Sequence, residues 1–428
     1  MTDSEAALPG FASIALHHWR QFESVELEMH PRLTVITGAN ASGKSTLLGI
    51  LGRHFNWTRA YSSSPFRMQD PEGVWYTVEP EMNDSAQAQG QSTVSVGEVS
   101  YGTGGETEIR VPTGPSIGQT QYDIQLPQQQ TFPGVYLPSH RAVSGNYAAV
   151  PTIPTAFGNS DQLFDLFTNE LRTRWAGGWS GKSPQLALKE SLIACAVFGV
   201  SNSEYVDANA EAHAIWTGFH TVLAAVLPSS LGFKRMRVRV PEIIIESEAG
   251  DFILDEASGG LSAIIEMSWQ IFLRSRNQVR FSVVLDEPEN HLHPSLQRQI
   301  MPSLLRAFPS VQFIVATHSP FVVTSTPESA VFVLDYNADR RVDSRRLDYA
   351  NKAASADETL RRVLGLESTF PAWAEARFDA IVSTHLEGSL TSAKLRTLRQ
   401  ELRANGLESE YAEAVSQLVD ATDEEGKL

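Results

Sequence analysis

The chain has 428 residues, 42% of them hydrophobic, which is long enough to build several compact parts with buried cores. Its formal net charge of −16 argues against a nucleic-acid binder that is basic all over, although a local basic face is not excluded. A single cysteine, Cys195, excludes an internal disulfide, and neither a signal-peptide pattern nor an apolar run of ~20 residues is present. We therefore expect a cytoplasmic protein with no membrane partner and with Cys195 buried in an apolar helix.

The N-terminal part predicts strands at Phe11–Trp19, at VELEM and at Leu33–Thr37, the last of them followed by a glycine-rich loop and the helix STLLGILGRHF. That order of strand, loop and helix is the context that a phosphate loop needs. From about residue 70 to 135, short alternating segments separated by Gly, Pro, Gln and Ser indicate an antiparallel sheet.

The middle of the chain turns helical from about 158 to 225 and ends in FKRMRVRV, which predicts a strand with one basic face. Two apolar strands follow at Phe281–Glu289 and Val311–Pro320, and a helix between them indicates parallel strands with a helical crossover. AVFVLDY predicts one more strand, and the chain reads as helical after Asn351 with a frayed last segment.

These patterns predict an α/β fold with a mixed sheet, an antiparallel β subdomain, an inserted helical lobe and a C-terminal helical extension. We expect four parts: 1–150 with the phosphate loop and the antiparallel strands, 151–260 as the helical lobe, 261–350 with the later parallel strands, and 351–428 as the extension.

The glycine-rich loop fits the pattern G-x-x-x-x-G-K-[ST]. Its glycines let backbone N–H groups face phosphate oxygens, and the helix that follows adds its positive dipole end. Lys44 is expected to reach the β- and γ-phosphates of ATP, Ser45 to hold Mg²⁺, and Thr46 to contact the α-phosphate. The residues predicted to bind the nucleotide here are Gly38, Ala39, Asn40, Ala41, Ser42, Gly43, Lys44, Ser45 and Thr46.

A second GKS, at Gly181-Lys182-Ser183, lacks this context because Ala176 stands at the place of the upstream glycine and Pro184 follows directly. We interpret it as a loop with a helix cap.

Two strand ends carry polar residues suited to phosphoryl chemistry. Asp286 and Glu287 follow an apolar strand, where Asp286 could hold the metal through water and Glu287 could take a proton from the attacking water. His318, in ATHSP, could donate to the γ-phosphate. Asp286 and Ser45 are the predicted metal ligands, and Glu287 and His318 the predicted catalytic residues.

Taken together, GxNxSGKST, LDEPENHLHP and ATHSP resemble the ABC-type ATPases of the RecF, SMC and OLD class. The resemblance implies a head-to-tail homodimer with two ATP molecules, each under the partner's signature motif. ASGGLS supplies that motif as Ser258, Gly259 and Gly260, opening a long helix. It departs from the LSGGQ of transporter cassettes. No glutamine stands where the family's Q-loop is expected, at YLPSHR, and Arg141 could act there instead.

His291 and His293 could share a metal ion, but no third His or Cys ligand stands at a recognisable spacing. We favour a segment that shapes the dimer face beside the nucleotide, with His293 preceding a helix that starts at Pro294.

The parts around the ATPase core distinguish the family's branches. The helical lobe lacks the long heptads of SMC proteins, and Asp335 and Asp339 lack the upstream glutamate of the Toprim nuclease domain found in OLD proteins. The architecture is similar to the stand-alone ATPases of bacterial defence systems, such as the Septu ATPase subunit, which pair with a separate nuclease or toxin. This analogy is one of fold and not of a site.

Two basic clusters give modest support to a role in DNA or RNA binding, although we favour solvated edge strands protected by charge as the interpretation of each. Their members are Lys234, Arg235, Arg237 and Arg239, and then Arg340, Arg341, Arg345 and Arg346. We expect an ATPase that controls a nucleic-acid-directed effector in defence or DNA repair. The alternatives are an ATP-gated scaffold for a partner protein and, less favoured, a transporter cassette.

Overall fold

We describe the protein from a computed structural model. The residues it describes are 9–69, 72–78, 92–113, 116–117, 120–139, 149–150, 152, 154, 157–200, 207–348, 355–365, 371–386 and 391–425. By its internal contacts the chain divides into two compact units, Met1–Thr359 and Leu360–Leu428. The four-part division expected from the sequence stays a prediction.

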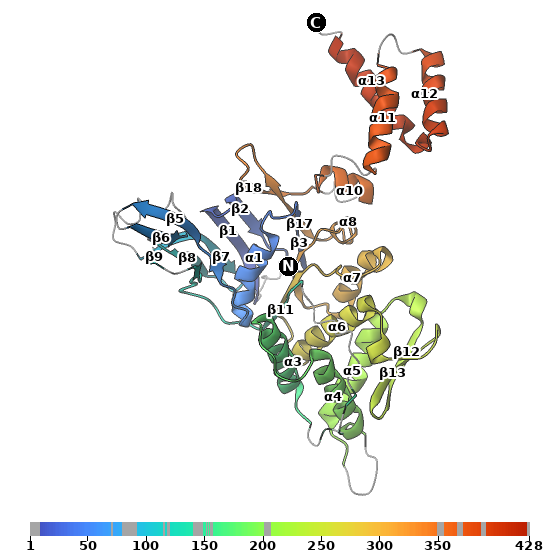
Figure 1. Ribbon diagram of the computed structural model, residues 1–428. Helices are drawn as coiled ribbons and strands as arrows, with labels where there is room; N and C mark the ends of the chain where they lie inside the picture. The colour runs from blue at the N-terminus through green and yellow to red at the C-terminus, as the bar shows by residue number, and fades with distance from the viewer. Residues whose placement is uncertain are drawn as a thin grey trace, which may run out of the picture. The chain divides into compact units, whose positions relative to one another are not determined.

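A ten-stranded mixed sheet is the centre of the first unit (Figure 1). In spatial order its strands are β11 (Gly134–Leu137), β15 (Ser282–Asp286), β16 (Gln312–Ala316), β3 (Leu33–Gly38), β17 (Ala330–Tyr336), β18 (Val342–Arg346), β2 (Phe22–Glu28), β1 (Phe11–Trp19), β7 (Thr93–Tyr101) and β8 (Glu106–Pro112). The strands from β11 to β17 are parallel to one another, whereas β2, β1, β7 and β8 pair in antiparallel fashion. Strand β18 is antiparallel to β17 and parallel to β2. The predicted α/β fold with a mixed sheet is confirmed.

The antiparallel region is built in two pieces. Strands β7 and β8 continue the main sheet, while β5 (Ser64–Gln69), β6 (Glu72–Thr77) and β9 (Ser116–Ile117) form a small sheet of their own. Of the predicted strand YDIQLP, only Tyr122 lies in a strand, β10 (Gln121–Tyr122), which pairs with β4 (Tyr61–Ser62), and Gln125 adds a single bridge to Arg110. The predicted antiparallel strands therefore serve mainly to widen the central sheet.

Helices cover the parallel strands. The first is α1 (Lys44–Gly52), which packs against β3, β15 and β16 and continues into the 3-10 turn η1 (Arg53–Phe55). Helix α7 (Pro294–Ala307) makes the crossover between β15 and β16, and the short α8 (Pro320–Val323) follows β16. The buried strands read as continuous apolar runs because helices and neighbouring strands enclose them.

The helical lobe consists of α3 (Ser160–Trp175), α4 (Pro184–Phe198) and α5 (Ala210–Val226), packed with α6 (Gly259–Asn277) (Figure 1). Side-chain caps fix the helix starts: Asn159 forms a capping box, and Ser183, Asn209 and Ser258 each accept a backbone N–H. Cys195 is buried in α4, as predicted.

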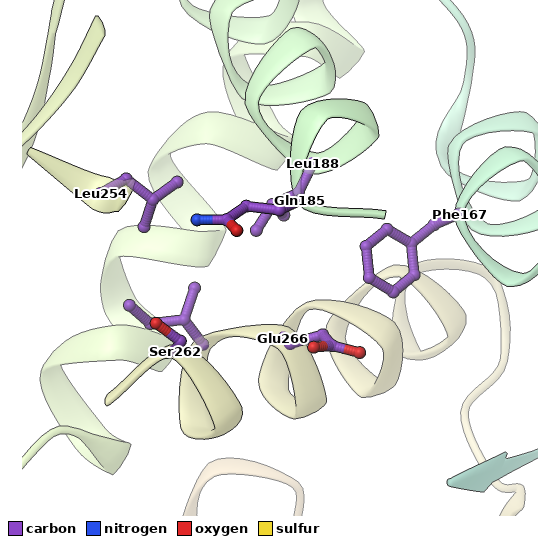
Figure 2. Close-up of a pocket in the computed structure, with 7 residues that line it drawn as sticks. Phe167, Gln185, Leu188, Leu254, Ser262 and Glu266 are labelled. Carbon is purple, nitrogen blue, oxygen red and sulfur yellow. The ribbon is translucent and has the colours of Figure 1, made fainter. Parts of the chain in front are cut away.

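The lobe is closely packed. Figure 2 shows Gln185, Ser262, Glu266 and their apolar neighbours around a gap between α3, α4 and α6, and its volume of about 20 Å³ is room for about one water molecule. A small sheet of β12 (Phe233–Arg239), β13 (Glu242–Ser247) and β14 (Phe252–Ile253) lies beside α5, after the 3-10 turn η2 (Ser229–Leu231).

One buried ion cluster links this small sheet to the lobe. The Nζ atom of Lys189, in α4, lies 2.9 Å from Glu242 Oε2 and 2.5 Å from Asp255 Oδ2. Asp255 belongs to the 3-10 turn η3 (Leu254–Glu256), just before α6. Because Lys189 is fully buried, losing either acidic partner would leave a costly charge imbalance.

The second unit is a small helical bundle, preceded by α10 (Ala356–Arg362) at the border of the two units. It contains α11 (Ala372–Thr384), α12 (Ser392–Ala404), the 3-10 turn η4 (Glu408–Glu410) and α13 (Tyr411–Glu425), whose apolar faces share a core that includes Phe378, Leu398 and Leu418 (Figure 1). Helix α13 runs to Glu425, so the part of the predicted frayed tail that the structure describes is helical. No helix in the described parts of the chain is long and apolar enough to cross a membrane.

Candidate nucleotide site

The strand order brings the predicted motifs to one edge of the sheet. Strand β16 lies between β15 and β3, with Asp286 opposite Ala316 and Ala316 opposite Ile36. These strands are parallel, so their carboxyl ends share an edge, as is usual for ligand sites in such sheets. The Gly-rich loop after β3, the acidic pair after β15 and the Thr317–His318 segment after β16 therefore meet.

The loop between β3 and α1 has a backbone that requires glycine at two places. Gly43 has a φ of 98°, and a Cβ there would come within 2.4 Å of the side chains of Gln21 and Phe22. Gly38 has a φ of 140°, and a Cβ there would lie 2.4 Å from the backbone oxygen of Leu334. No side chain caps the start of α1, and the N–H of Thr46 donates to Gly43 O, which leaves the N–H groups of Lys44 and Ser45 available to an anion.

Lys44 is folded back over this loop. Its Nζ donates to the backbone oxygens of Gly38 at 3.0 Å and Ala39 at 2.8 Å, and its side chain is buried. Burial lowers the pKa of Lys44 to about 8, against the opposing pull of Glu287 and Asp286. A phosphate group at this position would raise the pKa of Lys44 again, because a nearby negative charge stabilises the ammonium.

Asp286 and Ser45 are neighbours across the site. Asp286 is buried, which raises its pKa to about 6, and a hydrogen bond from the Ser45 side chain opposes that rise. A hydroxyl and a carboxylate are both oxygen ligands, which is the donor chemistry that Mg²⁺ prefers. The two predicted metal ligands therefore lie together at the phosphate loop.

Glu287 is held between two side chains. Its Oε2 accepts a hydrogen bond of 2.8 Å from Asn290 Nδ2, and its Oε1 lies 3.7 Å from His318 Nε2. Asn290 Nδ2 also reaches the backbone oxygen of Ser139, after β11, at 3.3 Å. Glu287 has a φ of 48°, which is uncommon outside glycine. Burial, together with the charge of Lys44, lowers the pKa of His318.

A cleft of about 190 Å³ opens beside the loop. The predicted residues Ala41, Gly43, Lys44, Ser45, Thr46 and His318 line it, together with two that sequence reasoning missed, Gln21 and Arg59. Gln21 follows β1 and Arg59 follows η1, and neither lies in a motif with a recognisable spacing. The remaining loop residues, Ala39, Asn40 and Ser42, lie between β3 and α1, with Ser42 buried.

The predicted signature residues do not line this cleft. Ser258 caps α6 by accepting the N–H of Leu261, and a Cβ on Gly260 would meet the backbone oxygen of His291 at 2.8 Å. The HLHP segment therefore packs against the start of α6. His293 caps α7 by accepting the N–H of Ser295, and no group of three potential metal ligands occurs among the described residues.

The second GKS is a helix start, as predicted. Ser183 caps α4 with Pro184 in its first turn, and Lys182 forms an ion pair with Glu190. The predicted Q-loop substitute, Arg141, lies outside the described residues.

Five of the eight cations in the two basic clusters form ion pairs with carboxylates. On β12, Arg235 and Arg237 both pair with Glu246 of β13. On β18, a strand that the sequence reading missed, the pairs are Arg345 with Asp335 and Arg346 with Glu28, and Arg341 pairs with Glu23. Acidic partners therefore interrupt both clusters, as in charged edge strands, and Lys234, Arg239 and Arg340 are exposed at their margins.

Two family models match the chain at the two halves of this site. One, described as "AAA domain", matches residues 13–70, and the other, described as "AAA domain, putative AbiEii toxin, Type IV TA system", matches residues 270–324. Together they contain the phosphate loop, the acidic pair and His318. At both halves of this site the chain is similar to ATPases with an AAA domain.

Curated relatives of this chain match over part of their length. A Septu protein PtuA of Bacillus thuringiensis is 26% identical over 34% of this chain and 40% of its own, and a Retron Ec83 probable ATPase of Escherichia coli is 31% identical over 27% and 23%. The chain thus spans less than half of these relatives. Among solved structures, the SMC head domain from Thermotoga maritima is similar over 79% of this chain and 99% of its own, at 13% identity and a TM-score of 0.37.

Proposed function

We propose that this chain is an ABC-type ATPase that binds ATP with Mg²⁺ on its phosphate loop and hydrolyses it to ADP and phosphate. The observation that carries the proposal is the meeting of Ser45 with Asp286 beside the Glu287–His318 pair. Separate elements supply a phosphate cradle, an oxygen ligand pair and a base, which are the parts that phosphoryl transfer needs.

The residues present fit ATP and Mg²⁺. Lys44 is a buried ammonium held only by backbone oxygens among the described residues, and the uncapped start of α1 adds N–H groups. Mg²⁺, when bound, would neutralise charge on the β- and γ-phosphates. Ser45 and Asp286 would hold it, Asp286 through water.

Glu287 is the proposed general base. Asn290 holds one oxygen of the Glu287 carboxylate, and the other oxygen faces His318. In that arrangement Glu287 takes a proton from the attacking water, and His318 donates to the γ-phosphate. Arg59, in the wall of the same cleft, adds positive charge where the phosphates would lie.

We further propose that two copies assemble head to tail around ATP. Ser258, Gly259 and Gly260 lie outside the cleft of their own chain, at the start of a helix whose dipole suits an anion. A signature that does not line its own cleft is available to the nucleotide of a second copy.

The output of the cycle is proposed to be control of a separate effector, such as a nuclease, directed at DNA or RNA. The similarity to a Septu protein and to a retron ATPase supports this. The carboxylates on both basic clusters weaken the case for a strong nucleic-acid face. They favour the second candidate, an ATP-gated scaffold that responds to a partner protein.

The test is the steady-state ATPase rate with and without duplex DNA at low salt, with Lys44→Ala as the blank. A rate above the blank supports hydrolysis, and a rate equal to the blank contradicts it. Stimulation by DNA that disappears at higher salt supports the nucleic-acid role, because phosphate contacts weaken steeply with salt. A rate that DNA does not change supports the scaffold.

A further inference from the structure

Glu289, the second glutamate of DEPE, makes a contact that the proposed chemistry does not use. It follows Asp286 by three residues and is buried, with 9% of its surface exposed. Its Oε1 accepts three hydrogen bonds, from Thr317 Oγ1 at 2.5 Å, His318 N at 2.9 Å and Ser319 N at 3.1 Å. One carboxylate oxygen thus accepts hydrogen bonds from three consecutive residues, Thr317, His318 and Ser319.

Without Glu289 the N–H of His318 would lose the acceptor that holds it. The neighbouring residues have other partners: the N–H of Ser319 also donates to Thr317 Oγ1 at 2.9 Å, and the backbone oxygen of Thr317 accepts from Thr37 Oγ1 at 3.0 Å. Buried N–H groups without an acceptor are unfavourable, so the loop would move to find water or other partners. The ring of His318 would move with it.

We propose that Glu289 is a positioning residue for ATP hydrolysis: by accepting both backbone N–H groups and the Thr317 hydroxyl, it sets the place of the His318 ring beside Glu287. This inference rests on the proposed function. It assigns one role to each glutamate of DEPE, with Glu287 acting on water and Glu289 acting through His318.

The geometry assigns the role to the acceptor oxygen and not to the charge. All three hydrogen bonds end on Oε1, whereas Oε2 is buried and has no hydrogen-bond partner among the described residues. Glutamine keeps an acceptor oxygen at the same reach, aspartate keeps the charge but is one methylene shorter, and alanine keeps neither. The three replacements therefore separate the two explanations.

The experiment measures kcat and KM for ATP, with the Kd of a fluorescent ATP analogue, on the full chain. We expect Glu289→Ala and Glu289→Asp to lower kcat by up to about 10²-fold with the Kd little changed, since a displacement of about 1 Å can cost that much. Glu289→Gln should keep most of the rate. Glu328→Ala, at an exposed glutamate after α8, is the matched control and should leave kcat unchanged.

A double-mutant cycle tests whether Glu289 acts through His318. If it does, Glu289→Ala combined with His318→Ala is no slower than His318→Ala alone. A further loss in the double variant, or a Glu289→Gln rate as low as that of Glu289→Ala, would overturn the proposal. Wild-type rates in all Glu289 variants would also overturn it, while leaving hydrolysis intact. Failure of the proposed function is a different result, a wild-type rate equal to that of Lys44→Ala.

Discussion

The Nε2 atom of His318 lies 3.7 Å from Oε1 of Glu287. The two residues meet because Asp286, the last residue of β15, pairs with Ala316, which stands 30 residues later in the sequence. The distance is longer than a hydrogen bond, and catalytic contacts often tighten only when substrate is bound. Hydrogen bonds position both residues: Asn290 donates to the Glu287 carboxylate, and Glu289 accepts from the backbone N–H of His318. Both contacts come from the same DEPEN segment.

Replacing Glu287 by glutamine is expected to slow hydrolysis by about 10²–10⁴-fold, because the base is lost while the shape is kept. ATP should still bind, since the phosphate loop and the Ser45–Asp286 contact remain, and the ATP-bound dimer should accumulate. Single-turnover hydrolysis and size-exclusion chromatography with ATP measure the two effects. Hydrolysis at the wild-type rate would mean that another group is the base.

Lys44→Ala is expected to abolish ATP binding, and the chain carries its own control in the second GKS. Lys182 pairs with Glu190 at the start of α4, outside the ATPase motifs, so Lys182→Ala should bind ATP as the wild type does. Equilibrium titration of a fluorescent ATP analogue compares the two variants. Equal losses in both would show that the phosphate loop has been misassigned.

The sequence predicts the parallel strands and their motifs well because each signal is local. An apolar run that ends in Asp286-Glu287 or in Thr317-His318 identifies both a buried strand and its polar tip. Parallel pairing then places the tips together, without further information. The loop geometry at Gly43 follows for the same reason, since the motif itself requires the positive φ.

The partners of the arginines could not be predicted in this way. Arg346 meets Glu28, and Arg341 meets Glu23, across more than 300 residues of sequence, and no local pattern indicates such pairs. Strand β18 was missed because its residues, VDSRR, are mostly polar. Gln21 and Arg59 were missed because the fold, not a motif, brings them to the cleft.

Mixing two inactive variants tests the head-to-tail dimer. Lys44→Ala removes the phosphate loop of its own chain, and Ser258→Arg would block the signature that the partner's nucleotide needs. In a mixed dimer, one of the two sites combines an intact phosphate loop with an intact signature, so ATPase activity should return on mixing. If each variant is inactive alone and the mixture stays inactive while the chains exchange, the nucleotide is not shared between chains in this way.

Asn290 is expected to hold the carboxylate of Glu287 in place. Its Nδ2 donates to Glu287 Oε2 at 2.8 Å and reaches the backbone oxygen of Ser139 at 3.3 Å. Asn290→Ala removes both contacts, so kcat should fall while ATP binding changes little. Steady-state kinetics and equilibrium titration of a fluorescent ATP analogue measure the two effects, and an unchanged kcat would separate Asn290 from the base.

His54 is expected to make the first unit sensitive to acid. It is buried, its Nε2 lies 2.9 Å from the Tyr101 hydroxyl and its Nδ1 lies 3.1 Å from the Leu51 oxygen, so a neutral ring can satisfy both contacts. Burial lowers the pKa of His54 to about 4 from 6.5. Between those values the unfolded chain binds the proton and the folded chain does not, so acid favours unfolding.

As the pH falls from 6.5 to 4, His54 should therefore cost up to about 3 kcal/mol of unfolding free energy. Above that window its contribution to stability is fully present, and it is lost as the pH approaches the folded pKa. Urea unfolding of the wild type and of His54→Gln, at neutral pH and near the folded pKa, measures the effect. Glutamine can donate and accept but does not titrate, so the wild type should lose stability more steeply than the variant. Parallel losses in the two proteins would mean that other groups govern the acid response, because only the difference between them reports the proton taken up by this one ring.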